Sequence, residues 1–340
     1  MQAGPDFVVL TGFLGSGKTT LLRDFLGLPE AADTAVIVNE AGEIGLDGVI
    51  LAESGGDVPM TMMSNGCVCC QVGSDLANTV EALMAAERPG AQGPLRRIIL
   101  ETSGLSKPGP VLRQLASLAE YRMRVAVVAT YDALRGTETT GFEEAAAQWA
   151  AAHRIVLTKT DAVAPDRLAE AQEEIAALNP LAETVVMAIR AAAVASAFAP
   201  LTAPGPMPEL PRSAVGSHAR VAVRLARPTC ALAYDDLAAW LDNLAGKLGE
   251  RLLRLKGLVR VAESERLLLV QCVGTLFSPP RPFGMPDAMA SPFLVIIARD
   301  LRADELEAIT PADLFRFSAW TEATPFDRAP RQGALRAEAV

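Results

Sequence analysis

Short apolar runs alternate with longer stretches of helical spacing throughout the N-terminal part of the chain. The apolar runs are rich in β-branched side chains and cover residues 7–10, 35–38, 98–100, 125–129, 155–157 and 184–187. Continuous apolar runs of this length are typical of strands buried on both faces of a parallel sheet. Helical spacing covers residues 19–26, 75–86, 109–119 and 165–178. This alternation predicts a doubly wound α/β domain with a mainly parallel sheet.

The rest of the chain has a different pattern. Residues 199–217 hold five prolines and two glycines without periodicity, which indicates a linker. Strand candidates follow at residues 220–225, 255–262, 266–273 and 293–298, and helix candidates at residues 234–248 and 303–309. This order predicts a smaller α+β domain with a mainly antiparallel sheet. We expect the first domain at residues 1–198, the linker at 199–218, the C-terminal domain at 219–312 and a tail at 313–340, which is poorly ordered after residue 319.

Composition narrows the classes of function. The 340 residues favour two domains, and the chain is 50% apolar and only 21% charged, which argues against global disorder. A net charge of −9 makes nucleic acid a poor partner. We find no apolar run of about eighteen residues, as a membrane helix would need. The first residues lack the basic region of a signal peptide, so we expect a cytoplasmic protein whose thiols stay reduced.

A glycine-rich loop is the sharpest signal. Residues 12–19 read GFLGSGKT, which fits GxxxxGK[ST] and lies between a predicted strand and a predicted helix. Its glycines let successive N–H groups point at phosphate oxygens, Lys18 adds a positive charge, and Thr19 offers a hydroxyl to Mg²⁺. The fold class is therefore a P-loop NTPase sheet. The expected phosphate-binding residues are Gly12, Gly15, Ser16, Gly17, Lys18, Thr19 and Thr20.

Residues 157–161, LTKTD, follow the fifth predicted strand and indicate which base is bound. Asp161 can accept two hydrogen bonds from guanine, from N1–H and the 2-amino group. Adenine lacks both donors and would leave the carboxylate unpaired, at a cost of about 1–3 kcal/mol. Thr158 and Lys159 complete this candidate site, with the Lys159 stem along the base plane. The alternative is a solvated lysine and an aspartate at a helix N-cap.

Residues 98–104, IILETSG, resemble a Walker B strand with Glu101 in place of aspartate. The Glu101 carboxylate would lie near Mg²⁺ and its waters, and the Gly104 N–H would approach the γ-phosphate. The alternative is an exposed acid at a strand end. Because no Gln or Arg stands out as the residue that positions water, we expect slow hydrolysis, with Lys18, Glu101 and Gly104 as the catalytic residues.

Three thiols lie within four residues, at Cys67, Cys69 and Cys70. Thiolates suit Zn²⁺, Cu⁺ and iron–sulfur clusters. A closed structural zinc site needs a fourth protein ligand, and no second CxxC is present, so this site is open or completed by a carboxylate or water. An open site suits transfer of the ion. Redox chemistry of neighbouring cysteines remains an alternative.

The other cysteines and the histidines carry weaker signals. Cys230 and Cys272 lie alone among apolar residues, and we expect both to be small buried side chains. His153 and His218 are the two histidines of the chain. His153 precedes a predicted strand, where a surface or packing role is more common than metal binding.

Together these motifs resemble those of the CobW-type GTPases, relatives of the nickel-accessory GTPases of urease and hydrogenase maturation. The matching segments are residues 12–20 (GFLGxGKTT), 39–45 (NEFGE, with Ala41 in place of Phe), 66–70 (GCxCC), 101–104 (E[TC][TS]G), 158–161 ([NT]KxD) and 253–257 (R-x-KG). The resemblance runs from about residue 7 to about residue 309.

The resemblance implies a slow GTPase whose Cys67, Cys69 and Cys70 bind a metal between the nucleotide and the switch segment, with Glu40 near Mg²⁺ or that metal. GTP would order the metal site, and hydrolysis would release the ion to a client metalloprotein. Zn²⁺ is the leading candidate, and Co²⁺ accepts the same ligands. Whether Cys272 assists the metal is left open, and so is a homodimer.

Two other functions remain open. One is a P-loop ATPase or small-molecule kinase that uses the cysteines structurally. The other is a regulatory binding protein that responds to GTP and to thiol oxidation. The resemblance itself also leaves open a cobalt-handling protein of cobalamin biosynthesis.

Overall fold

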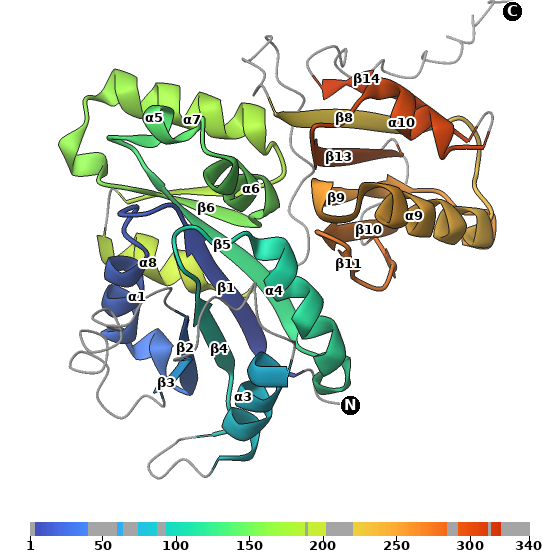
Figure 1. Cartoon of the computed structure of the whole chain (residues 1–340). Coiled ribbons are helices and arrows are strands. Elements are labelled where there is room, and N and C mark those ends of the chain that lie inside the picture. Colours follow the sequence, from blue (N-terminus) through green and yellow to red (C-terminus); the bar gives the residue numbers. More distant parts are fainter. Residues whose placement is uncertain are drawn as a thin grey trace, which may run out of the picture.

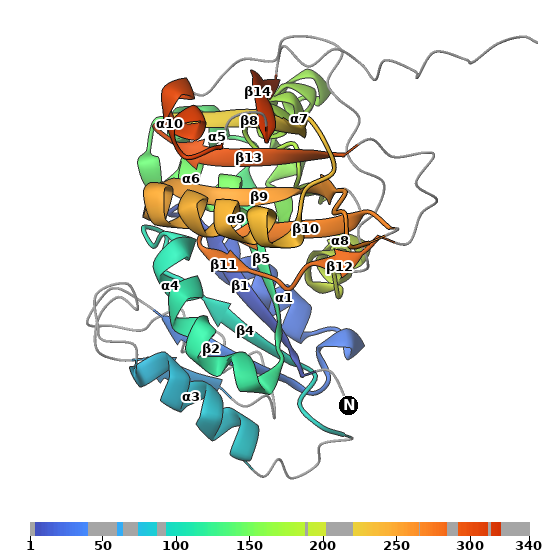
Figure 2. The same cartoon turned by 90° about the vertical axis from the view of Figure 1, so that its right-hand side faces the viewer.

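The computed structural model describes residues 4–39, 60–63, 74–86, 93–187, 190–201, 220–264, 266–283, 292–311 and 314–320. Within these ranges the chain forms two β-sheets with flanking helices, as Figures 1 and 2 show. Glu40, Cys67, Cys69, Cys70, His218 and most of the expected linker and tail lie outside the described residues. None of the described helices is long and apolar enough to cross a membrane.

The first sheet contains seven parallel strands in the order β3-β2-β4-β1-β5-β6-β7. Their bounds are β1 (Asp6–Gly12), β2 (Thr34–Asn39), β3 (Met60–Met63), β4 (Arg97–Glu101), β5 (Arg124–Asp132), β6 (Arg154–Thr158) and β7 (Glu183–Val186). Six of them were predicted from the apolar runs. The seventh, β3, was missed because it has only four residues and no β-branched apolar side chain.

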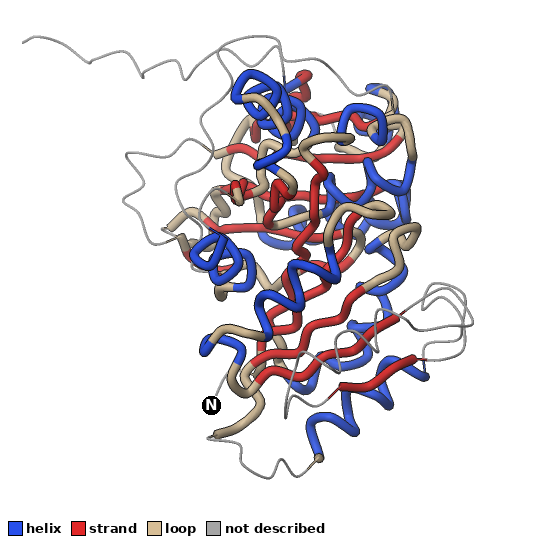
Figure 3. Tube along the Cα trace, turned by 90° about the vertical axis from the view of Figure 1, so that its left-hand side faces the viewer, coloured by secondary structure: helices blue, strands red, loops and turns tan. Residues whose placement is uncertain are grey.

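Helices cover both faces of this sheet, which confirms the predicted doubly wound fold (Figure 3). They are α1 (Lys18–Leu26), α3 (Ser74–Ala85), α4 (Pro108–Leu115), α5 (Gly136–Thr139), α6 (Glu143–Ala151), α7 (Pro165–Leu178) and α8 (Arg190–Phe198), with 3₁₀ turns η1 (Pro29–Ala31), η2 (Ala116–Tyr121) and η3 (Thr160–Ala162). Alternate residues of each strand face opposite sides. On β1, Phe7 and Val9 pack toward α3, α4 and α6, whereas Val8 and Leu10 pack toward α1 and α8.

The second sheet is antiparallel, as predicted, with the order β11-β10-β9-β13-β8-β14 and β12 paired to β10. Its strands are β8 (Val221–Pro228), β9 (Leu252–Val259), β10 (Leu268–Val273), β11 (Leu276–Phe277), β12 (Arg281–Pro282), β13 (Phe293–Arg299) and β14 (Phe315–Ala319). Helices α9 (Tyr234–Leu248) and α10 (Ala303–Ala308) pack against the second sheet in a core that contains Trp240 and Leu306. The turn η4 (Gly249–Arg251) leads into β9.

Helix α6 lies between the two sheets (Figure 1). All seven of its residues from Ala145 to Ala151 are buried, and its alanines share one core with Val223 of β8 and Val295 of β13. A helix that is buried on every side lacks the one-sided apolar stripe that identifies a surface helix. For this reason the sequence pattern did not predict α6, although this helix packs against both sheets.

Candidate nucleotide-binding site

The loop between β1 and α1 has the curled backbone that phosphate binding requires. Gly15 and Gly17 have φ values of 70° and 92°, in the left-handed region that favours glycine. Helix α1 then begins at Lys18, so its N-terminus opens on the loop. The Lys18 amine donates to the carbonyl of Gly12 at 2.9 Å and to that of Phe13 at 3.3 Å, which folds the side chain back over the loop.

Hydroxyl groups fasten this loop to the ends of two neighbouring strands. Ser16 Oγ donates to the Phe13 carbonyl at 2.6 Å and lies 2.6 Å from Thr130 Oγ1 of β5. Thr158 Oγ1, at the end of β6, donates to the Ser16 carbonyl at 2.8 Å. The Ser16 side chain therefore shapes the loop from within, and Thr20, also expected at the phosphates, is exposed on the first turn of α1. These hydrogen bonds hold the loop in its curled form.

Two side-chain oxygen atoms that could bind a metal ion lie close together beside the loop. Thr19 Oγ1 on α1 donates to Glu101 Oε1 at the end of β4, at 2.6 Å. They come together because β4 lies next to β1, which carries the loop. A hydroxyl and a carboxylate are hard oxygen ligands, the set that Mg²⁺ prefers. The structure therefore brings the two predicted magnesium ligands into one place, and their chemistry fits that ion.

The segment after β4 touches the loop from the other side. A Cβ atom placed on Gly104 would lie 2.8 Å from the Leu14 nitrogen and 3.0 Å from Leu14 Cα. Only a hydrogen fits there, so glycine is required by close approach of the two backbones. Gly104 thus lies against the phosphate-binding loop, where its N–H was expected.

The predicted base-recognition residues follow β6. Lys159 adopts a left-handed φ of 55°, and its amine pairs with Asp132 Oδ2 at 2.5 Å. Asp161 lies in η3, exposed to solvent. Asp132 ends β5, and its other oxygen accepts the N–H groups of Leu134 and Arg135 at 3.0 and 3.2 Å. Sequence reasoning missed Asp132, although its position at the carboxyl end of a parallel strand was a usable signal.

Residues of the second sheet and the isolated cysteines lie away from these groups. Arg254 and Lys256, from the R-x-KG segment, are on β9, where burial lowers the pKa of Arg254 and lowers that of Lys256 to about 8. Cys272 is buried, as predicted, and burial raises the pKa of its thiol to about 12. Cys230 is exposed, so the prediction that it is buried was wrong. It follows the end of β8, where the chain turns toward α9.

His153 serves as a packing residue. Its Nδ1 accepts the backbone N–H of Val127 at 3.0 Å. Burial, with the charges of Arg254, Lys256 and Arg154, holds the pKa of His153 well below its usual range. The ring is therefore neutral. Within the part of the chain that the structure describes, no group of three or more His, Cys, Asp and Glu side chains is arranged to hold a metal ion.

The predicted cysteine ligands and Glu40 are not among the described residues, but the strands that precede them are. β2 ends at Asn39 and β3 ends at Met63, and these strands are parallel neighbours. Both end at the same edge of the sheet as β1 and β4, the edge with the loop and Glu101. The fold and these contacts together define a P-loop nucleotide-binding protein.

Comparison with known proteins identifies the family. The profile of the CobW/HypB/UreG nucleotide-binding domain matches residues 6–186, and that of the cobalamin synthesis protein CobW C-terminal domain matches residues 221–312. The chain belongs to the CobW/HypB/UreG family. This confirms the resemblance seen in the motifs and the assignment as a P-loop GTPase.

Several relatives match over most of the chain. The zinc chaperone CobW of Pseudomonas aeruginosa is 30% identical, over 86% of this chain and 87% of its own length. The zinc chaperone YjiA of Escherichia coli is 28% identical, over 88% of this chain and 96% of its own. The crystal structure of Zn(II)-bound YjiA GTPase from E. coli covers 91% of this chain and 98% of its own, with 23% identity and a TM-score of 0.63, which supports the fold.

Proposed function

We propose that this protein is a GTP-driven metallochaperone that carries a transition metal, with zinc as the leading candidate, to a client metalloprotein. The observation that carries the proposal is the assembled phosphate site: Lys18 over the loop, with Thr19 hydrogen-bonded to Glu101. The names of the relatives, zinc chaperones that match over most of the chain, support zinc as cargo.

The chain's own groups suit the handling of GTP. Lys18 neutralises phosphate charge, and the Gly104 N–H contacts the γ-phosphate. Thr19 and Glu101 would hold Mg²⁺, which when bound neutralises the β- and γ-phosphates. Asp161 selects guanine, while the ion pair of Lys159 with Asp132 fixes the lysine beside the base.

The cargo site is assigned to Cys67, Cys69 and Cys70, with Glu40 nearby. Three thiolates leave one position open on a tetrahedral ion, so a client thiol or imidazole can enter and take the metal. Free thiols need a reducing compartment, so we place the cycle in the cytoplasm. The ends of β2 and β3 support coupling to the nucleotide, because both segments start from the edge of the sheet that carries the phosphate loop.

A metal titration tests the proposal. Zn²⁺ and Co²⁺ are titrated into the chain with Mg²⁺ and either a non-hydrolysable GTP analogue or GDP, and Co²⁺ is followed by its thiolate charge-transfer absorption. Tighter binding with the analogue, lost when Cys67, Cys69 and Cys70 are replaced by alanine, supports the metallochaperone. Cys230→Ala is the matched control, because it removes an exposed thiol elsewhere. Binding that ignores the nucleotide would instead favour a regulator that responds to thiol oxidation.

A further inference from the structure

The segment between β4 and α4, residues 102–107, lies against the phosphate loop and is held from behind by one side chain. Gln148 of α6 is completely buried, and its Nε2 donates to the carbonyls of Gly104 at 3.0 Å and Ser106 at 2.9 Å. An amide nitrogen has two hydrogens, so both are used on this segment. Gln148 Oε1 is buried without a hydrogen-bond partner among the described residues, so the side chain makes no competing bond there.

These two bonds hold the turn that carries the Gly104 N–H. A trans peptide is planar, so this N–H is oriented by the Ser103 carbonyl of the same peptide, which accepts the Ser106 N–H at 3.0 Å. Gln148 holds the turn through the carbonyls of Gly104 and Ser106. The front end of the segment is held by the Thr102 N–H, which donates to the Leu10 carbonyl of β1 at 2.9 Å. Between these anchors Leu105 is 52% exposed, so packing of its own side chain does not hold the segment in place. On the α6 side the segment is held by the bonds from Gln148 and by the ion pair of Lys107 with Glu143.

Gln148 can act in this way because α6 is itself immobilised at both ends. At its C-terminal end, Asn179 Nδ2 donates to the carbonyls of Trp149 at 2.7 Å and Ala152 at 2.9 Å. At its N-terminal end, Glu143 pairs with Lys107, with Arg220 just before β8 and with Arg299 of β13.

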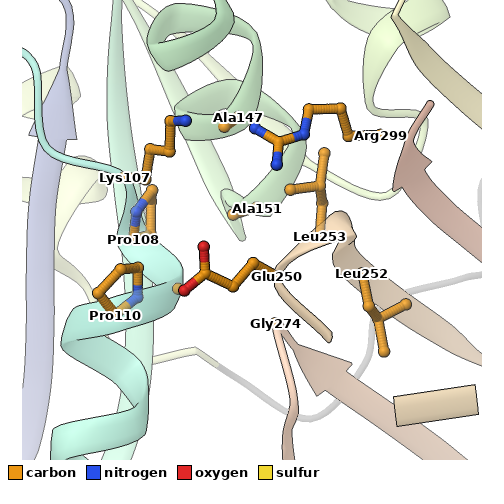
Figure 4. Close-up of a pocket in the computed structure, with 11 residues that line it drawn as sticks. Lys107, Pro108, Pro110, Ala147, Ala151, Glu250, Leu252, Leu253, Gly274 and Arg299 are labelled. Carbon is orange, nitrogen blue, oxygen red and sulfur yellow. The ribbon is translucent and has the colours of Figure 1, made fainter. Parts of the chain in front are cut away.

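A cleft lies beside this ion-pair cluster, between α4, α6 and β9. Figure 4 shows the side chains of Lys107 and Arg299 directed toward one another across it, beside Ala147. Lys107 is the last residue of the segment that Gln148 holds. Arg299 belongs to β13 of the second sheet, and both side chains pair with Glu143 of α6. The segment is therefore connected to the second sheet through Glu143.

We propose that Gln148 is the positioning residue of the γ-phosphate-sensing segment: it holds residues 104–106 so that the Gly104 N–H meets the γ-phosphate. The inference rests on the role proposed above for Gly104. GDP lacks the γ-phosphate, so this contact distinguishes GTP from GDP. Loss of the Gln148 bonds should therefore weaken binding of GTP and leave binding of GDP unchanged.

The test compares two buried amides: Gln148 of α6, and Asn179, which follows α7 and donates to the C-terminal end of α6. Gln148→Met keeps the length of the side chain and removes both donors. Asn179→Leu is the matched control, because Asn179 is 1% exposed and also donates to backbone carbonyls, but at the other end of α6. The readouts are the Kd values of a non-hydrolysable GTP analogue and of GDP, kcat for GTP and the unfolding midpoint. Gln148→Asn, whose donor is retracted by about 1.5 Å, is the second variant if Gln148→Met fails to fold.

We expect Gln148→Met to raise the Kd of the GTP analogue about tenfold and to lower kcat about tenfold. The Kd of GDP should stay within about twofold of wild type. Gln148→Asn should change the same quantities by less. Asn179→Leu should lower the unfolding midpoint and leave the ratio of the two Kd values unchanged. Equal loss of both nucleotides, or the same ratio in both variants, would overturn the inference. A wild-type protein that binds the analogue no better than GDP would instead remove the role of Gly104, and the inference with it.

Discussion

The contact between Gly104 and Leu14 leads to the sharpest prediction, for Gly104→Ala. The new Cβ would lie 2.8 Å from the Leu14 nitrogen, 3.0 Å from Leu14 Cα and 2.7 Å from Leu14 Cδ2. Leu14 is 58% exposed, so Cδ2 can rotate away, but the two backbone atoms cannot. Ordinary contact between these atoms begins near 3.5 Å, so the backbones must separate by about 0.7 Å. Overpacking of this kind costs about 1–3 kcal/mol, which is roughly 5- to 150-fold in nucleotide affinity.

The assay is the titration of a fluorescent guanine nucleotide, with GTP turnover measured in parallel. Because the displaced loop binds the phosphates of both nucleotides, the affinities for GDP and GTP should fall together. In Gln148→Met only the affinity for GTP should fall. Gly109→Ala is the matched control, since a Cβ there meets nothing within 4 Å. The double variant Leu14→Ala with Gly104→Ala should remain impaired, because alanine keeps the backbone contacts. Normal affinity in Gly104→Ala, or full rescue by Leu14→Ala, would refute the reasoning.

Three further predictions concern the loop, the base and the second sheet. Thr158→Val keeps the side-chain shape but removes the donor to the Ser16 carbonyl, and should raise the Kd of both GDP and GTP about tenfold. Thr34→Val, at another buried threonine, should leave both Kd values unchanged. Equal Kd values for Thr158→Val and wild type in a nucleotide titration would contradict this. Asp161→Ala should raise the ability of ATP to displace bound GTP, and unchanged competition would remove the aspartate from base selection. Burial lowers the pKa of Lys256 from 10.5 to about 8, so the unfolded chain binds more protons between these values and stability rises with pH there. Lys256→Met should flatten this rise and increase the urea midpoint at pH 7. If the stability of the two proteins changed with pH in the same way, burial of the Lys256 charge would have no measurable cost.

Local patterns predicted the parts of the site that are contiguous in the chain. The loop at residues 12–19 needs glycines, a lysine and a threonine in fixed order, so the sequence shows it directly. The pairing of Thr19 with Glu101 joins residues 82 positions apart, but each follows or opens a recognisable element at the same sheet edge. The parallel order of the strands then brings them together.

The parts that were missed depend on packing between distant segments. Gln148 is one polar residue in an alanine-rich stretch, and nothing nearby shows that it would reach the carbonyls of Gly104 and Ser106. The pairing of Lys159 with Asp132 likewise depends on the adjacency of β5 and β6. The exposure of Cys230 depends on where the chain turns after β8, which its apolar neighbours did not indicate.

The burial of α6 on both sides limits how the two halves of the chain can change independently. Alanine side chains on this helix let its backbone approach β5 on one side and β9 on the other. A larger side chain at Ala145, which is completely buried, would overpack the core that residues of both sheets share. In a chimera that joined this nucleotide-binding half to the C-terminal half of a distant relative, the side chains of α6 would therefore pack poorly against the new sheet. We expect such chimeras to fold only when the residues of α6 that contact the second sheet are exchanged together with that sheet.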